Sequence, residues 1–208
     1  HISGGLGTAS YGLTRGMLHH DLDIIFVVPK THGDEEKSKI KLISAEEVPV
    51  AIREKDLHYF RDRFKYIEIE SALVPYMDPE EFERMREKEI TSVREESVIR
   101  TNEKLTFTGT YSGDLYGEVA RYALIGASLG QEEEFDLIHA HDWLAYPAGI
   151  AAKKASGKPL VIHVHATEFD RTGEQVNETV FNIEKTGMEQ ADLIIAVSNM
   201  TRNIVIER

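Results

Sequence analysis

The sequence predicts an α/β domain in which a parallel β-sheet carries helices on both faces. Four short apolar runs have the length and composition of buried parallel strands, and segments with helical spacing lie between them. Strands that alternate with helices imply right-handed crossover connections. The chain has 208 residues, 41% hydrophobic and 29% charged, which suits one globular core spanning residues 1–208. The predicted strands are Asp23–Pro29, Asp136–Ala140, Leu160–Val164 and Asp192–Val197.

The first half of the chain carries weaker structural signals than the second half. A glycine-rich segment opens it, and a stretch dense in Glu, Arg and Lys closes it, as is typical of a solvated helix and loop. Besides its strand, this half is predicted to contain a glycine loop at Gly4–Gly7, a helix at Thr8–His20, a loop at Thr31–Lys41, a half-buried strand at Lys65–Pro75, and a solvated helix and loop at residues 78–104.

The helix after the second predicted strand has clear start and stop signals. Asp142 can cap its start, and Pro147 fits its first turn. Lys153 and Lys154 fit the last turn, and Gly157 ends the helix. Three other helices are predicted in this half: Asp114–Leu129, with Leu115, Val119, Tyr122, Gly126 and Leu129 facing the core; Asn177–Gln190; and a last helix capped by Ser198 or Asn199.

Composition excludes several classes of function. The 24 basic and 36 acidic residues give a net charge of −12 without a Lys/Arg run, which argues against a nucleic-acid partner. The absence of cysteine excludes disulfides and thiolate chemistry. With no membrane-length apolar run and no signal-peptide pattern, we expect a cytoplasmic protein without a membrane partner. Because the chain opens on a glycine loop and closes inside a predicted helix, we expect one domain of a longer polypeptide.

The first polar motif is the glycine pair in HISGGLG. Gly4 and Gly5 let backbone N–H groups approach a ligand closely, and the helix that follows carries partial positive charge at its start. This arrangement favours a phosphate or a developing anion. The motif lacks the G-K-[ST] of a P-loop and the spacing of a dinucleotide fingerprint. A tight turn without a ligand is the alternative.

Two histidine pairs follow, at the ends of neighbouring predicted strands. The segments are His139–Trp143 (HAHDW) and His163–Arg171 (HVHATEFDR), and ligands of open α/β sheets bind beyond such strand ends. Strand alternation puts His163 and His165 on one face, with His165 at the lip. There it can donate hydrogen bonds to sugar hydroxyls or to an oxyanion. The alternative is a histidine bound to neighbouring backbone.

Four histidines at strand ends also raise the question of a metal site. A zinc site needs converging ligands, and H-x-H pairs on parallel strands do not guarantee convergence. The sequence therefore predicts no metal.

In this order, the motifs resemble those of the GT-B glycosyltransferases, in particular the glycogen and starch synthase-like branch. The matching residues are Gly4–Gly7, His139–Trp143, His165–Arg171 and Ala191–Arg202 (ADLIIAVSNMTR). The resemblance implies the amino-terminal half of a GT-B fold, a Rossmann-like domain on the acceptor side, with the carboxy-terminal nucleotide-sugar domain absent from these residues. It also implies a retaining transferase that moves glucose from ADP- or UDP-glucose to a glucan or other saccharide acceptor. No cofactor is implied, because the nucleotide-sugar is a substrate.

The resemblance also assigns residues to roles. Gly4 and Gly5 would face the donor diphosphate, and His165 would be the catalytic residue beside the donor sugar. Asp142, Thr167 and Glu168 would line the cleft as acceptor-binding or supporting residues, and Arg171 is a weaker candidate. Where such glycogen synthases often carry lysine, two positions before the glycine pair, this chain has Ile2, which favours a broader glycosyltransferase assignment or a different phosphate contact.

Two other functions are compatible with the same fold. One is a nucleotide-sugar epimerase, against which the resemblance at HATEFDR argues. The other is a non-catalytic module that binds carbohydrate or nucleotide. An isolated acceptor-side domain is expected to be inactive, because half of the cleft would be missing.

Overall fold

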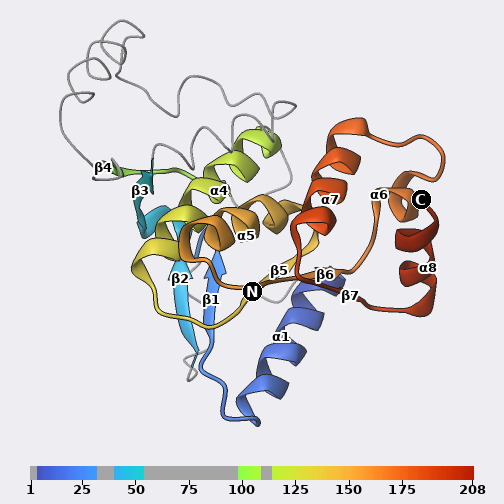
Figure 1. Ribbon diagram of the computed structural model, residues 1–208, viewed down its shortest axis with the longest axis horizontal. Helices are drawn as coiled ribbons and strands as arrows, with labels where there is room; N and C mark the ends of the chain where they lie inside the picture. The colour runs from blue at the N-terminus through green and yellow to red at the C-terminus, as the bar shows by residue number, and fades with distance from the viewer. Residues whose placement is uncertain (1–3, 32–39, 54–97, 109–113) are drawn as a thin grey trace, which may run out of the picture.

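The structure, a computed structural model, describes residues 4–31, 40–53, 98–108 and 114–208 (Figure 1). The predicted strand at Lys65–Pro75 lies outside these residues, as do residues 78–97 of the helix and loop predicted over 78–104. The elements are α1 (Gly4–Leu18), β1 (Ile25–Val28), β2 (Lys41–Ser44), the 3-10 helix η1 (Ala45–Glu47), β3 (Pro49–Arg53), β4 (Val98–Lys104), α4 (Leu115–Glu132), β5 (Ile138–His141), α5 (Asp142–Ser156), β6 (Leu160–Val164), α6 (Glu168–Thr172), α7 (Glu178–Gln190), β7 (Leu193–Ala196) and α8 (Asn199–Glu207).

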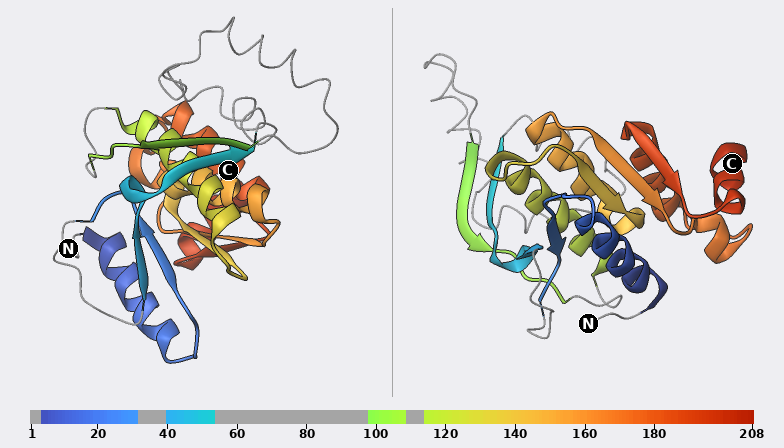
Figure 2. Two further views of the ribbon diagram at one scale, coloured as in Figure 1. Left: turned by 90° about the vertical axis from the view of Figure 1, so that its left-hand side faces the viewer. Right: turned by 90° about the horizontal axis from the view of Figure 1, so that it is seen from below.

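The described strands confirm the α/β class with parallel pairing. β5, β6 and β7 form a parallel sheet in that order, and β1 pairs in parallel with β2. α5 connects β5 to β6 and α7 connects β6 to β7, as crossovers between parallel strands require. The hydrogen-bonded strands fall into three sheets, since β3 and β4 form a separate antiparallel pair. Figure 2 shows this pair at one end of the molecule and α8 at the other.

Helix α4 bonds to the β1–β2 and β3–β4 pairs and packs against α5. The Tyr122 hydroxyl donates to the carbonyl of Val27 on β1 at 2.9 Å, and the Ser128 hydroxyl accepts from the N–H of Ala51 on β3 at 2.8 Å. α4 and α5 run side by side (Figure 1), with Gly126 of α4 against the backbone of Ala148 on α5. The predicted core positions of this helix are confirmed for Val119, Gly126 and Leu129, which are buried, whereas Leu115 and Tyr122 are half-buried.

The predicted end of α5 is confirmed, but its predicted start is wrong. Gly157 terminates the helix with φ 74°, and Lys153 and Lys154 lie in the last turn. The residue before the helix is His141, without a side-chain cap, and Asp142 is the first helical residue. The Asp142 carboxylate points to the next strand, so it does not cap α5. Pro147 lies inside the helix, beyond its first turn, and is buried.

Four predictions for the first half of the chain are corrected. Gly4–Gly7 is the first turn of α1 and not a loop, and α1 ends at Leu18 rather than at His20. Lys41 begins β2, where a loop was predicted. Residues 98–104, predicted as solvated helix and loop, form β4, whose pairing with β3 crosses a long sequence separation that local charge patterns do not reveal.

Strand β7 differs from its prediction in burial. It was predicted to be a buried strand, yet Leu193 is 56% exposed and Ile194 38% exposed. The reason is its position at the edge of the three-stranded sheet, beside β6 only. The cap of the last helix is confirmed, since the Ser198 side chain accepts from the N–H of Thr201 at 3.0 Å. Among the described residues, none of the helices combines the length and apolar character that a membrane span requires.

Candidate functional site

The two histidine pairs lie on the face of the β5–β6–β7 sheet that α5 does not cover. Gly149 of α5 packs against the side chains of Ala140 on β5 and Leu160 on β6. Side chains alternate along a strand, so the neighbours of Ala140 on β5, His139 and His141, point away from α5. The parallel register pairs His141 with His163, which therefore points the same way. The sequence pattern and the register together bring residues of two strands to one surface.

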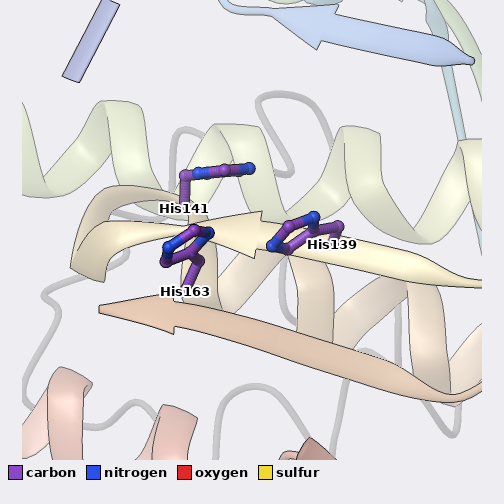
Figure 3. A group of neighbouring side chains, drawn as sticks. All are labelled: His139, His141 and His163. Carbon is purple, nitrogen blue, oxygen red and sulfur yellow. The ribbon is translucent and has the colours of Figure 1, made fainter. Parts of the chain in front are cut away.

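The four imidazole rings form a continuous group, in which each ring contacts at least two others. Nδ1 of His141 and Nε2 of His165 are 3.0 Å apart, a hydrogen bond whose donor depends on the tautomer. The ring centroids of His163 and His165 are 4.5 Å apart, and those of His139 and His163 are 5.3 Å apart with parallel planes. Figure 3 shows the rings of His139, His141 and His163 gathered over the end of β5, with His163 reaching from the adjacent strand.

Burial favours the neutral form of three of these rings, His139, His141 and His163. Loss of solvation, followed by repulsion from neighbouring histidines, lowers the pKa of His141 to about 3. The pKa values of His139 and His163 are also lowered, first by burial and then by their histidine neighbours. Nε2 of His139 and Nδ1 of His163 are buried and have no hydrogen-bond partner. The site therefore presents uncharged imidazoles with uncommitted nitrogens.

These lowered pKa values predict a stability that falls on acidification. Between about pH 6.5, the usual histidine pKa, and the value of about 3 for folded His141, the unfolded chain binds more protons than the folded chain. Stability must then decrease as the pH falls through that window, by at most about 1.4 kcal/mol per pH unit for one histidine. Solvent screening makes the pKa shift smaller and so reduces the total loss of stability, because the ring is half-buried.

We expect urea unfolding with EDTA present to show a smaller stability at pH 5.5 than at pH 7.5, and a weaker pH dependence in His141→Gln. His20→Gln, which alters an exposed histidine in the turn after α1, serves as the control and keeps the wild-type dependence. Identical pH profiles for wild type and His141→Gln would contradict the assignment.

A hydrogen bond joins the side chain of Asp142 to the backbone of His165. The Asp142 carboxylate accepts a hydrogen bond from the N–H of His165 at 2.8 Å. Asp142 has a φ of 58°, in the left-handed region that aspartate tolerates better than most residues. This conformation turns the chain from β5 into α5 and directs the carboxylate at the end of β6. Asp142 thereby fixes the position of the His165 backbone.

Thr167 and Glu168 begin α6 and belong to a buried polar network. Thr167 and Asp170 form a capping box, in which the Asp170 carboxylate accepts from the Thr167 N–H at 2.7 Å. Glu168 is 3% exposed and accepts from Nε of Arg171 at 3.2 Å. Arg171 also pairs with Glu184 of α7, which accepts from the N–H of Glu168 at 2.9 Å. The network fixes the segment that follows His165.

Sequence reasoning missed two features of the site: the buried Glu184, and the contact of His139 with the other histidines. Glu184 is 4% exposed and lies on the buried face of α7 with Val180, Ile183 and Gly187. A charged residue in register with an apolar helical face was the available signal, because such a residue needs a buried partner. For His139, the H-x-H spacing was visible, but the register between β5 and β6 was not.

The structure brings together four of the six predicted site residues. His165, Asp142, Thr167 and Glu168 surround the end of β6. Gly4 and Gly5 form the start of α1. Their place on a common rim with His165 stays a prediction.

The arrangement defines an α/β domain with a polar site at the carboxyl ends of parallel strands. The family model of Glycosyltransferase Family 4 matches residues 94–208, which include β4 to α8 and the whole histidine group. The match covers more than half of the chain, and the chain belongs to this family. It is thus a glycosyltransferase domain of the GT-B amino-terminal type. No curated protein and no solved structure matches the chain.

Proposed function

We propose that this domain is the acceptor side of a retaining glycosyltransferase that moves glucose from a nucleotide-sugar, ADP- or UDP-glucose, to a glucan or another saccharide. The observation that carries the proposal is the position of His165. It directly follows β6, with its backbone N–H bonded to Asp142 and its ring bonded to His141. The family supports sugar transfer in general. The resemblance of His165–Arg171 and Gly4–Gly7 to glycogen synthase-like enzymes supports the finer assignment.

The chemistry that this site has to perform is modest. The donor sugar must be held so that its leaving diphosphate is stabilised, and the acceptor hydroxyl must lie on the same face of the sugar as that leaving group, because a single in-line displacement would invert the configuration. His165 would donate a hydrogen bond near the reacting carbon, and its bond to His141 would hold the imidazole in one orientation. Asp142, Thr167 and Glu168 would position this residue and the adjoining acceptor surface. Gly4 and Gly5 would face the diphosphate across a cleft shared with a second, nucleotide-binding domain.

The replacement His165→Ala tests the proposal in the full-length gene product. We expect kcat to fall by about 100-fold or more, the usual effect of removing one preorganised hydrogen-bond donor. The folded state should persist, because the Asp142 bond uses the backbone N–H of His165 and survives the replacement. Activity is measured as the release of nucleoside diphosphate with maltooligosaccharide acceptors, and the fold by circular dichroism.

His20→Ala serves as the matched control, since His20 is exposed and lies in the turn after α1. It should retain wild-type turnover. An unchanged kcat in His165→Ala would reject the role of His165. Conversion of the nucleotide-sugar without any acceptor would instead favour the epimerase, and saccharide binding without transfer would favour a binding module.

A further inference from the structure

Three histidines of the site converge in a way that sugar transfer does not require. His139, His141 and His163, the three-histidine cluster, each offer one ring nitrogen, and these nitrogens all lie within 4.8 Å of one another. In the described part of the chain, no other group of three or more His, Asp or Glu side chains brings ligand atoms so close. The convergence that the sequence pattern could not guarantee is present in the fold.

The cluster also contains polar atoms whose burial is otherwise uncompensated. Nε2 of His139 and Nδ1 of His163 are both buried without a hydrogen-bond partner. A buried polar group in that state costs about 1–3 kcal/mol, and native structures retain few such groups. A single cation between the rings would satisfy these nitrogens together, whereas neighbouring histidines alone leave them unsatisfied. The three histidines are half-buried, and Ile195 of β7, which pairs with His163, is 37% exposed, so a cation could enter from the β7 side.

We propose that His139, His141 and His163 bind one divalent transition-metal ion of the zinc type. Imidazole nitrogens bind such ions at about 2.0–2.1 Å, so tetrahedral ligand nitrogens lie about 3.3 Å apart. The ring nitrogens, now within 4.8 Å of one another, would have to move closer together when the ion binds, by rotation of the rings about their side-chain bonds. Three protein ligands leave a fourth position for water or for an oxygen of a bound substrate.

The contact between His141 and His165 fits this ligand set. Metal-bound histidines usually donate their second ring N–H to a neighbouring acceptor, which fixes the tautomer. Nδ1 of His141 is 3.0 Å from Nε2 of His165, which leaves Nε2 of His141 for the ion. His165 thereby acts as a positioning residue for the metal site. This inference does not depend on the proposed sugar transfer, since it uses only the ring geometry.

The ligand chemistry also predicts selectivity. Three imidazoles suit Zn²⁺, Co²⁺, Ni²⁺ and Cu²⁺, whereas Mg²⁺ and Ca²⁺ require oxygen ligands. The cluster contains no carboxylate. Mg²⁺ in large excess should therefore leave Zn²⁺ binding unchanged.

Metal titration of the untagged chain, stripped with EDTA, tests the site. Isothermal titration with ZnCl₂ should give one ion per chain, and Co²⁺ should produce the visible absorption of a tetrahedral complex. His163→Gln should weaken Zn²⁺ binding at least about 100-fold, since even residues behind the ligands change affinity 10- to 100-fold. The double variant His19→Gln/His20→Gln removes two adjacent exposed histidines and should keep the wild-type affinity.

Three results would overturn the proposal: no stoichiometric Zn²⁺ binding, equal affinity in wild type and His163→Gln, or loss of binding in the double variant. If His163→Gln does not fold, X-ray absorption on the zinc-loaded wild-type chain decides instead. A first shell with three imidazoles supports the cluster as the ligand set. A shell dominated by oxygen, or with a single imidazole, contradicts it.

Discussion

Replacing Gly126 with alanine is expected to lower the free energy of unfolding by about 3 kcal/mol, at the upper end of overpacking effects. Gly126 lies on α4 where that helix crosses α5. A Cβ atom at this position would be 2.3 Å from the carbonyl oxygen of Ala148 and 2.9 Å from its Cα. Both are backbone atoms of α5, so no side-chain rotation can relieve the overlap. The two helices would have to separate.

Helix propensity opposes this loss but is too small to offset it. Alanine is better than glycine inside a helix by about 1 kcal/mol at most. Separation of α4 from α5 would loosen the packing around Ile125 and Ile150, which are fully or almost fully buried in the core. Gly130 is in the same situation, because a Cβ atom added there would lie only 2.8 Å from the carbonyl oxygen of Ala152. The small residues four positions apart on each helix thus permit the close approach.

Gly12→Ala is the matched control. Gly12 lies inside α1 and is exposed, and a Cβ atom at this position would extend into open space, with no atom within 4 Å of it outside its own stretch of helix. Here propensity acts alone, and we expect a gain of up to about 1 kcal/mol. Urea unfolding of the two variants beside wild type measures both effects. A Gly126→Ala protein as stable as wild type would refute the close crossing of α4 and α5.

Local signals predicted the elements around the site well. Strand β6 spans Leu160–Val164 as predicted, because a run of β-branched and apolar residues is bounded by Pro159 and a polar segment. Asn177 caps α7 through its side chain, and Gly157 ends α5 with a positive φ. Each of these features depends on residues that are adjacent in sequence, so the sequence contains the information directly.

Features that depend on distant partners could not be predicted. β4 forms only because it pairs with β3, and a charged sequence such as VIRTNEK gives no local indication of that partner. The apolar β7 resembles a buried strand, but its burial depends on whether another element covers it. Asp142 is a favourable cap by residue type, yet its carboxylate bonds to the N–H of His165, which directly follows β6.

The candidate site shows the same difference between features set by the local sequence and features set by distant partners. The position of His165 beside a strand end followed from the chain around it. The contact of four imidazoles required the parallel register of β5 and β6, in which His141 is opposite His163. A shift of one residue would have turned one histidine pair to the α5 side. The sequence alone predicted no metal, because this register was not visible in it.

Replacing Arg171 with alanine is expected to cost about 3 kcal/mol, the lower end of the loss when a buried charge is left without its partner, because the Arg171 side chain is itself 32% exposed. Arg171 bonds to the carboxylates of Glu168 and Glu184, whose side chains are each 5% exposed. Without the guanidinium, two buried carboxylates would face each other with only backbone N–H partners remaining. Urea unfolding at pH 7.5 measures the loss.

Acidification should reduce the cost of Arg171→Ala. Burial already raises the pKa of Glu184, and removal of the neighbouring cation raises it further. The folded variant then takes up a proton at a higher pH than the unfolded chain does, so lowering the pH favours its folded state. The difference in stability between wild type and Arg171→Ala should therefore be smaller at pH 5 than at pH 7.5.

Lys185→Ala provides the comparison on the same helix. Lys185 pairs with Glu189 at 3.8 Å, and both side chains are more than half exposed. Such a surface pair contributes about 0–1 kcal/mol, so this variant should stay close to wild type. The second replacement Glu184→Gln, added to Arg171→Ala, should recover part of the loss because it removes one unpaired charge. If Arg171→Ala costs no more than Lys185→Ala, the two buried glutamates do not depend on Arg171, and the network does not fix the segment after His165.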